Sequence, residues 1–90
     1  MDYPARTPEQ LGQILRALRL GRSMPQTELA TDSGLLQKTI SLLERAPERA
    51  TVETLMRAIA ALDADLVIRP RTDGGSPTEP QHGAERGDDW

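Results

Sequence analysis

Residues 25–44 contain two short apolar-faced segments separated by Gly34. Their helical spacing predicts two short α-helices, and Gly34 can adopt the positive φ that a tight turn between them requires. Ala30 supplies the small side chain that is needed where the two helices cross, and Leu35 and Ile40 are expected to hold the second helix against the first. The segment therefore predicts a pair of crossed helices joined by a glycine turn.

A further helix is predicted on each side of this pair. The start Thr7-Pro8-Glu9-Gln10 combines a capping threonine, a proline suited to the first helical position and a glutamine that completes a capping box. This helix ends near Gly21, and Thr51 caps a fourth helix that continues through Leu62. Residues 46–49 are expected to form a loop. The body of the chain is thus predicted to be an all-α bundle of four helices.

The fourth helix is followed by a short apolar run, Leu66, Val67 and Ile68, which Pro70 stops. This run predicts one C-terminal β-strand, and the chain offers no second strand to pair with it. An unpaired strand exposes its N–H and C=O groups, so we expect it to pair with the same strand of a second copy in a twofold dimer. The alternative is an extended segment folded onto the chain's own helices.

Charge and composition separate a body from a tail. Residues 1–70 carry nine Lys and Arg and nine Asp and Glu, whereas residues 71–90 carry two Arg and five acids, so the tail holds the formal net charge of −3. The tail has no Leu, Ile, Val or Phe, which predicts disorder, and Trp90 at its end either has no role or anchors a binding partner. We expect an N-terminal arm at 1–6, a folded domain at 7–70 that contains the four helices and the dimerising strand, and a disordered acidic tail at 71–90.

Composition also excludes several classes of protein. A chain of 90 residues without cysteine holds one small domain that has neither disulfides nor a cysteine-based zinc site. Its single histidine and the lack of a Gly-rich phosphate loop argue against an enzyme, a metal site or a cofactor. No apolar run reaches the roughly 18 residues that span a membrane, and residues 1–10 show no secretory signal, so a cytoplasmic protein is expected.

The two crossed helices have the pattern of a helix-turn-helix, whose second helix enters the major groove of DNA. Gln37, at the start of that helix, is the best candidate to read a base, because glutamine can bond bidentately to adenine. Glu44 is expected to be structural and to pair with an arginine such as Arg16 or Arg45. A solvated surface is the alternative for each polar residue here. The candidate DNA-binding residues are Gln26, Thr27, Gln37, Lys38, Thr39 and Ser41, with Arg19 and Arg22 as candidate phosphate contacts.

The pattern Gln26-x-Glu28-Leu29-Ala30, then Gly34, then Gln37-x-Thr39-Ile40-Ser41-x-x-Glu44 resembles the XRE/Cro-repressor family of helix-turn-helix regulators, which have a lambda-repressor-like fold. The helix start at Thr7, the strand after the fourth helix and the polar tail ending in tryptophan resemble HipB-type antitoxins. This resemblance implies a homodimer that binds palindromic operator DNA upstream of its own operon. It also implies that the chain binds a HipA-type Ser/Thr kinase toxin and holds it inactive.

Two positions depart from the family pattern. Pro25 stands where the family usually has a threonine that caps the first helix of the pair, and Leu36 stands where a polar or basic residue often contacts DNA. Two other functions also stay open. One is an XRE repressor without a toxin partner. The other is a protein-interaction module that has lost DNA binding, which the neutral body favours and the outward-facing Gln26, Gln37 and Ser41 oppose.

Overall fold

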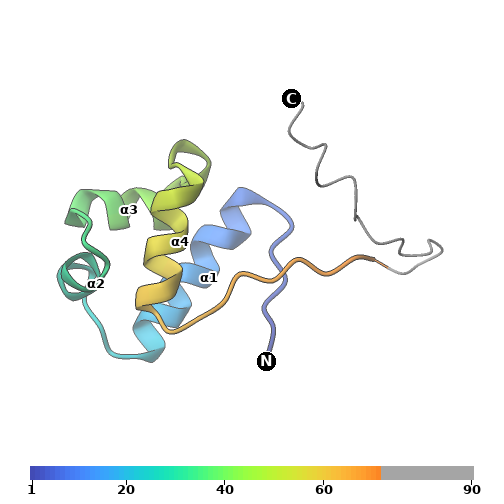
Figure 1. Cartoon of the computed structure of the whole chain (residues 1–90), viewed down its shortest axis with the longest axis horizontal. Coiled ribbons are helices and arrows are strands. Elements are labelled where there is room, and N and C mark those ends of the chain that lie inside the picture. Colours follow the sequence, from blue (N-terminus) through green and yellow to red (C-terminus); the bar gives the residue numbers. More distant parts are fainter. Residues whose placement is uncertain (72–90) are drawn as a thin grey trace.

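The computed structural model describes residues 1–71, which form four α-helices and one 3-10 helix (Figure 1). In chain order they are α1 (Pro8–Gly21), α2 (Gln26–Ser33), α3 (Gln37–Arg45), the 3-10 helix η1 (Pro47–Arg49) and α4 (Val52–Ala61). The predicted all-α bundle of four helices is therefore confirmed. The loop expected at 46–49 is instead one turn of 3-10 helix, whose Pro47 is buried. The predictions for the tail and for Trp90 lie outside the described residues.

Threonine hydroxyls begin the first and the last α-helix, as the sequence predicts. Thr7 Oγ1 accepts a hydrogen bond of 3.0 Å from the Gln10 N–H, and Thr51 Oγ1 accepts one of 3.1 Å from the Thr54 N–H. The Gln10 side chain bonds the Arg6 N–H rather than that of Thr7, so the capping box closes one residue early. Caps of this kind stabilise a helix by about 1 kcal/mol each.

Gly34 ends α2 with φ of 71°, the left-handed conformation that the turn requires. The Leu35 N–H then bonds the Ala30 carbonyl at 2.9 Å, which closes the turn and redirects the chain into α3. Asp63 ends α4 in a similar way, with φ of 58°, and the Ala64 N–H bonds the Ile59 carbonyl at 3.1 Å. The turn at Gly34 was predicted from the glycine. The turn at Asp63 was not predicted, because aspartate adopts a positive φ less often than glycine does.

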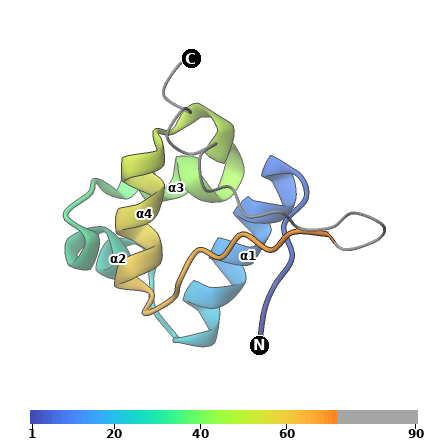
Figure 2. The same cartoon turned by 45° about the vertical axis from the view of Figure 1, so that its right-hand side comes forward.

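The four helices share one apolar core. In Figure 2, α3 lies behind the upper part of α4, and it packs against both α1 and α2. Gly12 allows the close approach of α1 to α3, since a Cβ there would overlap the Glu44 carbonyl oxygen. Burial of the core side chains is the main stabilising term for a domain of this size. The buried apolar residues are Leu15, Met24, Leu29, Ala30, Ile40, Leu43, Ala58, Ile59 and Leu62.

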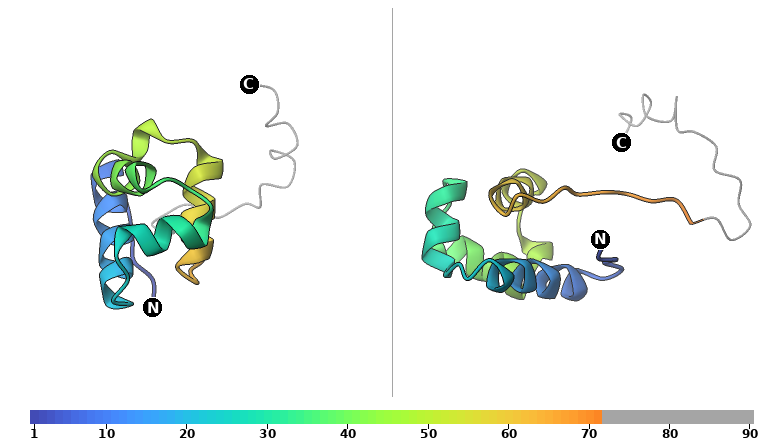
Figure 3. Two further views of the ribbon diagram at one scale, coloured as in Figure 1. Left: turned by 90° about the vertical axis from the view of Figure 1, so that its left-hand side faces the viewer. Right: turned by 90° about the horizontal axis from the view of Figure 1, so that it is seen from below.

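Residues 64–71 leave the bundle as an extended segment on the side away from α2 and α3 (Figure 3, right). Leu66, Val67 and Ile68 are exposed, and Ile68 reaches 88 %. The strand predicted here is not formed in the single chain, because no strand is present within residues 1–71 to supply a hydrogen-bonding edge. The predicted pairing with a second copy stays a prediction. Along this segment Arg69 pairs with Asp2 of the N-terminal arm at 3.1 Å, and the two stretches line an open groove beside α1.

Candidate nucleic-acid interface

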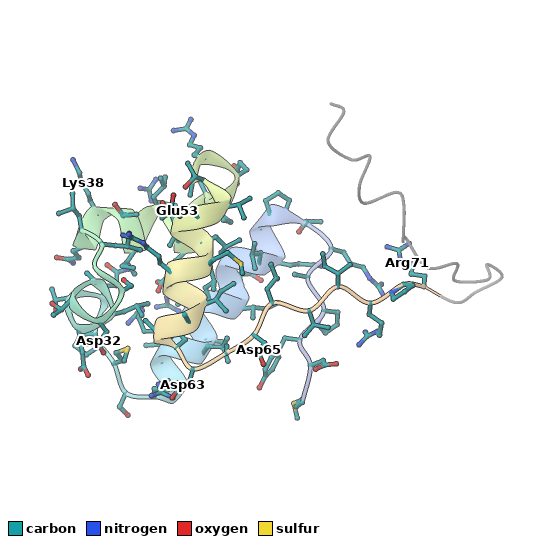
Figure 4. The ribbon with its side chains drawn as sticks, in the orientation of Figure 1. Asp32, Lys38, Glu53, Asp63, Asp65 and Arg71 are labelled. Atoms are coloured by element: carbon teal, nitrogen blue, oxygen red, sulfur yellow. The ribbon has the colours of Figure 1, made fainter. Side chains whose placement is uncertain are left out.

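The first turn of α3 presents polar side chains to solvent. Gln37 and Lys38 are exposed, and Figure 4 shows Lys38 pointing away from the body of the protein. On the opposite face of the same helix, Ile40 and Leu43 are each only 1 % exposed and fix the helix to the core. A short helix anchored on one face and polar on the other is the arrangement with which helix-turn-helix proteins enter the major groove.

The remaining candidates on α2 and α3 lie around this turn at different depths. Thr27 is exposed in the first turn of α2, whereas Gln26, Thr39 and Ser41 are half-buried. Gln26 and Gln37 are brought together, since the Gln37 Nε2 donates to the Gln26 Oε1 at 3.4 Å. The starts of the two helices thus form one polar surface.

A buried ion pair lies directly beneath this surface. Arg19 of α1 donates from Nε to Glu44 Oε2 at 2.6 Å and from Nη2 to Glu44 Oε1 at 3.0 Å. Its Nη1 donates to the Met24 carbonyl at 2.9 Å. The hydrogen bonds to Glu44 raise the pKa of the Arg19 guanidinium, and the negative charge of Glu44 adds to this against the lowering effect of burial. The contacts with Glu44 therefore favour the charged form of the Arg19 side chain in the folded protein.

Hydrogen bonds connect this ion pair to Gln37, the candidate base-reading residue. Gln26 donates from Nε2 to Glu44 Oε1 at 3.2 Å. A carboxylate only accepts hydrogen bonds, so this contact fixes the Gln26 amide with its Oε1 directed elsewhere, and that oxygen accepts from Gln37. The hydrogen bonds run from Arg19 through Glu44 and Gln26 to Gln37, and so they connect the core to the first turn of α3.

Two expectations from the sequence are corrected here. Arg19 is 7 % exposed and its guanidinium is used within the chain, so it is not placed to contact a phosphate. Glu44 is structural, as expected, but its partner is Arg19 rather than Arg16 or Arg45. The signal was present in the sequence: Arg19 follows Leu15 by four residues and therefore lies on the buried face of α1.

The other candidate phosphate contact, Arg22, lies apart from the first turn of α3. It pairs at 3.6 Å with Asp63, which Figure 4 places at the end of the bundle remote from Lys38. A cation that was given no role from the sequence lies nearer: the Arg57 guanidinium of α4 is beside the turn at Gly34. Within residues 1–71 no group of three or more His, Cys, Asp or Glu is arranged to hold a metal ion, and no helix there is both long and apolar enough to cross a membrane.

Comparison with known proteins agrees with this geometry. A family model described as helix-turn-helix matches residues 15–68. The chain is 38 % identical over 63 residues to an uncharacterized HTH-type transcriptional regulator, y4dL, of Sinorhizobium fredii, a match that covers 70 % of this chain and 32 % of the relative. It is 29 % identical over 62 residues to the antitoxin HipB of Escherichia coli, covering 69 % of this chain and 70 % of HipB. The chain thus spans about a third of y4dL.

Solved structures of HipB share the fold. In a HipA–HipB–O2–O3 complex, the similar chain superposes with a TM-score of 0.72 at 26 % identity, over 77 % of this chain and 97 % of that one. A HipB–O4 20mer complex gives the same TM-score and identity over the same shares of the two chains. The region matched by the family model begins within α1 and ends in the exposed apolar segment, so it contains the whole candidate interface.

Proposed function

The chain belongs to the helix-turn-helix family, and we propose that it is a HipB-type antitoxin: a dimer that represses its own operon by binding operator DNA, and that also binds and inactivates a HipA-type Ser/Thr kinase. Similarity to the antitoxin HipB over most of both chains supports this assignment. The proposal has three parts, namely the DNA, the second copy and the kinase, and different features of the chain support each of them.

The exposed polar first turn of α3 is the observation that carries the DNA-binding part. Gln37 uses one N–H of its amide on Gln26 and keeps its Oε1 and its second N–H free for a ligand. An acceptor and a donor side by side are what bidentate recognition of adenine requires, at N6 and N7. Lys38, exposed beside it, would contact a guanine or a phosphate.

Gln26 has two roles in this proposal. It holds the Gln37 amide in a defined orientation, and its own orientation is set by the buried Glu44. It also lies at the first position of α2, where the helix N-terminus favours a phosphate. Thr27, Thr39 and Ser41 would add contacts to the DNA backbone or to base edges around the same turn.

The exposed apolar segment supports the dimer. Leu66, Val67 and Ile68 would pair with the same residues of a second copy, which would cover side chains that the single chain leaves in water. A twofold pair would place two α3 helices about 34 Å apart, one turn of DNA, so that the preferred site is palindromic.

The kinase partner is supported by the relatives. The antitoxin HipB is similar along most of its length, and one of the similar structures holds HipB together with HipA. Trp90, which lies outside the described residues, is proposed as an anchor for the kinase. A repressor without a toxin is the second candidate, because the y4dL relative is described only as a transcriptional regulator.

Binding to the DNA upstream of its own gene tests the proposal. The purified chain would be titrated against that duplex in a mobility-shift assay, with and without the product of the adjacent gene. A specific shift that changes when the second protein is added supports the antitoxin, and a specific shift that does not respond supports the repressor without a toxin. A folded chain that gives no specific shift at moderate salt contradicts both and points to a protein-interaction module.

The matched variants are Gln37→Ala and Gln13→Ala. Both remove an exposed glutamine side chain, but Gln13 lies on α1, beside the N-terminal arm. Loss of affinity in the first variant with none in the second locates DNA binding at the first turn of α3. Equal affinities of the two variants would contradict that location.

A further inference from the structure

Leu36 is an exposed apolar residue immediately before α3, with 63 % of its surface accessible. Between Gln26 and Arg45 it is the only large apolar side chain that is exposed. Its neighbour Leu35 packs against the core and secures the turn. Leu36 therefore contributes little to the packing of the two helices.

Leu36 is also a poor start for its helix. It is the N-cap residue of α3, and an aliphatic side chain offers no oxygen to the free N–H groups of the first turn. The structure shows what an efficient cap looks like in this chain, since the hydroxyls of Thr7 and Thr51 cap α1 and α4. Leucine is among the weakest N-cap residues. The stability of the domain therefore does not explain why leucine stands here.

The surroundings of Leu36 suggest what it contacts. The next two residues are Gln37 and Lys38, both exposed and both polar, so Leu36 is an isolated apolar side chain on a polar surface. Apolar surfaces that bind proteins are contiguous patches of some hundreds of Å², which one leucine does not provide. The major groove of DNA, in contrast, presents a single small apolar group, the C5 methyl of thymine.

We propose that Leu36 reads the C5 methyl of a thymine, next to the base that Gln37 contacts in each half of the DNA site. The inference rests on the proposed DNA binding and adds a residue that determines its specificity. Contact with the leucine removes the methyl group and the exposed side chain from water together. A site with cytosine or uracil at that position lacks the methyl group, so it loses the binding free energy that burial of the methyl against Leu36 provides.

Deoxyuridine substitution isolates this one methyl group. Duplexes that the full chain binds would be selected from a random-sequence pool, and each thymine of the selected site would then be replaced singly by deoxyuridine. One thymine in each half-site is expected to respond, with binding about fourfold weaker, as for one buried methyl or methylene group. In Leu36→Ala the thymine and deoxyuridine duplexes should bind equally.

Two further variants separate recognition of the thymine methyl group from the stability of the fold. Val52→Ala removes another exposed apolar side chain, 70 % accessible and on α4, and should keep the thymine preference. Leu36→Ser gives α3 a hydroxyl cap, so its thermal unfolding midpoint should rise while its thymine preference disappears. A residue with only a structural role would not produce these opposite changes.

The outcomes are distinguishable from a failure of the proposed function. Sequence-selective binding in which no thymine responds, or in which Leu36→Ala responds as strongly as the parent, overturns the inference and leaves DNA binding intact. A chain that selects no sequence from the pool overturns the proposed DNA binding and the inference together.

Discussion

Arg19 and Glu44 join α1 to α3 through two parallel hydrogen bonds of 2.6 and 3.0 Å, beneath the surface proposed to meet DNA. Both side chains are nearly inaccessible, at 8 % and 6 %. Each therefore depends on the other to compensate its buried charge. Because the pKa of Arg19 is raised, the stability that its charge provides is present below the ordinary pKa of arginine and is lost only at still higher pH.

Breaking this pair is expected to destabilise the fold strongly. Glu44→Ala leaves the Arg19 charge buried without a partner and should lower the free energy of unfolding by about 3 kcal/mol or more. The double variant Arg19→Met, Glu44→Leu removes both charges, and its free energy of unfolding should fall much less than that of Glu44→Ala. Urea denaturation followed by circular dichroism measures both variants.

The exposed pair of Glu53 and Arg57 provides the control. Its side chains lie 4.0 Å apart on the surface of α4, so Glu53→Ala should change the free energy of unfolding by less than about 0.5 kcal/mol. If Glu44→Ala were no more destabilising than Glu53→Ala, the account of the buried pair would be wrong.

Gly12 and Gly21 lie on the same helix and should respond to alanine in opposite directions. A Cβ at Gly12 would overlap the Glu44 carbonyl, so Gly12→Ala must separate α1 from α3 and should destabilise the fold by about 1–3 kcal/mol. Nothing lies within 4 Å of a Cβ at Gly21, and Gly21→Ala should be neutral or stabilise by up to about 1 kcal/mol. Thermal unfolding of the two variants, measured side by side, would contradict this packing if Gly12→Ala were the more stable.

Gln37 and Lys38 should affect DNA binding in different ways. Gln37→Ala is expected to weaken binding by about 1–3 kcal/mol and to relax the preference at one base pair, because a base contact carries sequence information. Lys38→Ala, if Lys38 contacts a phosphate, should weaken all sequences alike and reduce the salt slope of the binding constant by about 1. Anisotropy titrations at several salt concentrations distinguish the two. A salt slope unchanged in Lys38→Ala would assign the lysine to a base or to solvent.

The exposed apolar segment should determine the oligomeric state. Val67→Asp places a charge in the middle of the proposed pairing and should shift the protein from dimer to monomer without loss of helix content. Val52→Asp introduces the same charge at an exposed position on α4 and should leave the dimer unchanged. Sedimentation velocity decides the question. A monomeric parent protein would refute the dimer directly.

The sequence predicted several features that depend on neighbouring residues, although it missed the turn at Asp63 and the 3-10 helix η1. The Thr7 cap, the Gly34 turn and the start of α3 at Gln37 all follow from signals within a few positions of each other, and the structure has them as predicted. The partner of Glu44 was predicted wrongly, because it depends on how α1 and α3 cross, and Arg19 is 25 residues away. The hydrogen bond between Gln26 and Glu44 likewise depends on how the helices pack and not on neighbouring residues in the sequence.

The segment after α4 shows a different limit of sequence reasoning. Its β-branched residues indicate extended backbone, which the structure has, but a strand also needs hydrogen-bonding partners from a neighbouring edge. Within residues 1–71 the single chain provides no such edge. Whether a second copy provides it depends on association, which local sequence does not encode.

The ion pair between Asp2 and Arg69 brings the N-terminal arm and the extended segment together on the side of the bundle away from α2 and α3 (Figure 1). The chain therefore enters and leaves the folded domain on one side and offers its helix-turn-helix on the other. A bulky attachment before Met1 or after Arg71, whether a fluorescent reporter or a second bound protein, would not stand between α3 and a DNA duplex. Attachments at either end of the described domain would therefore leave α3 accessible for the proposed contact with DNA.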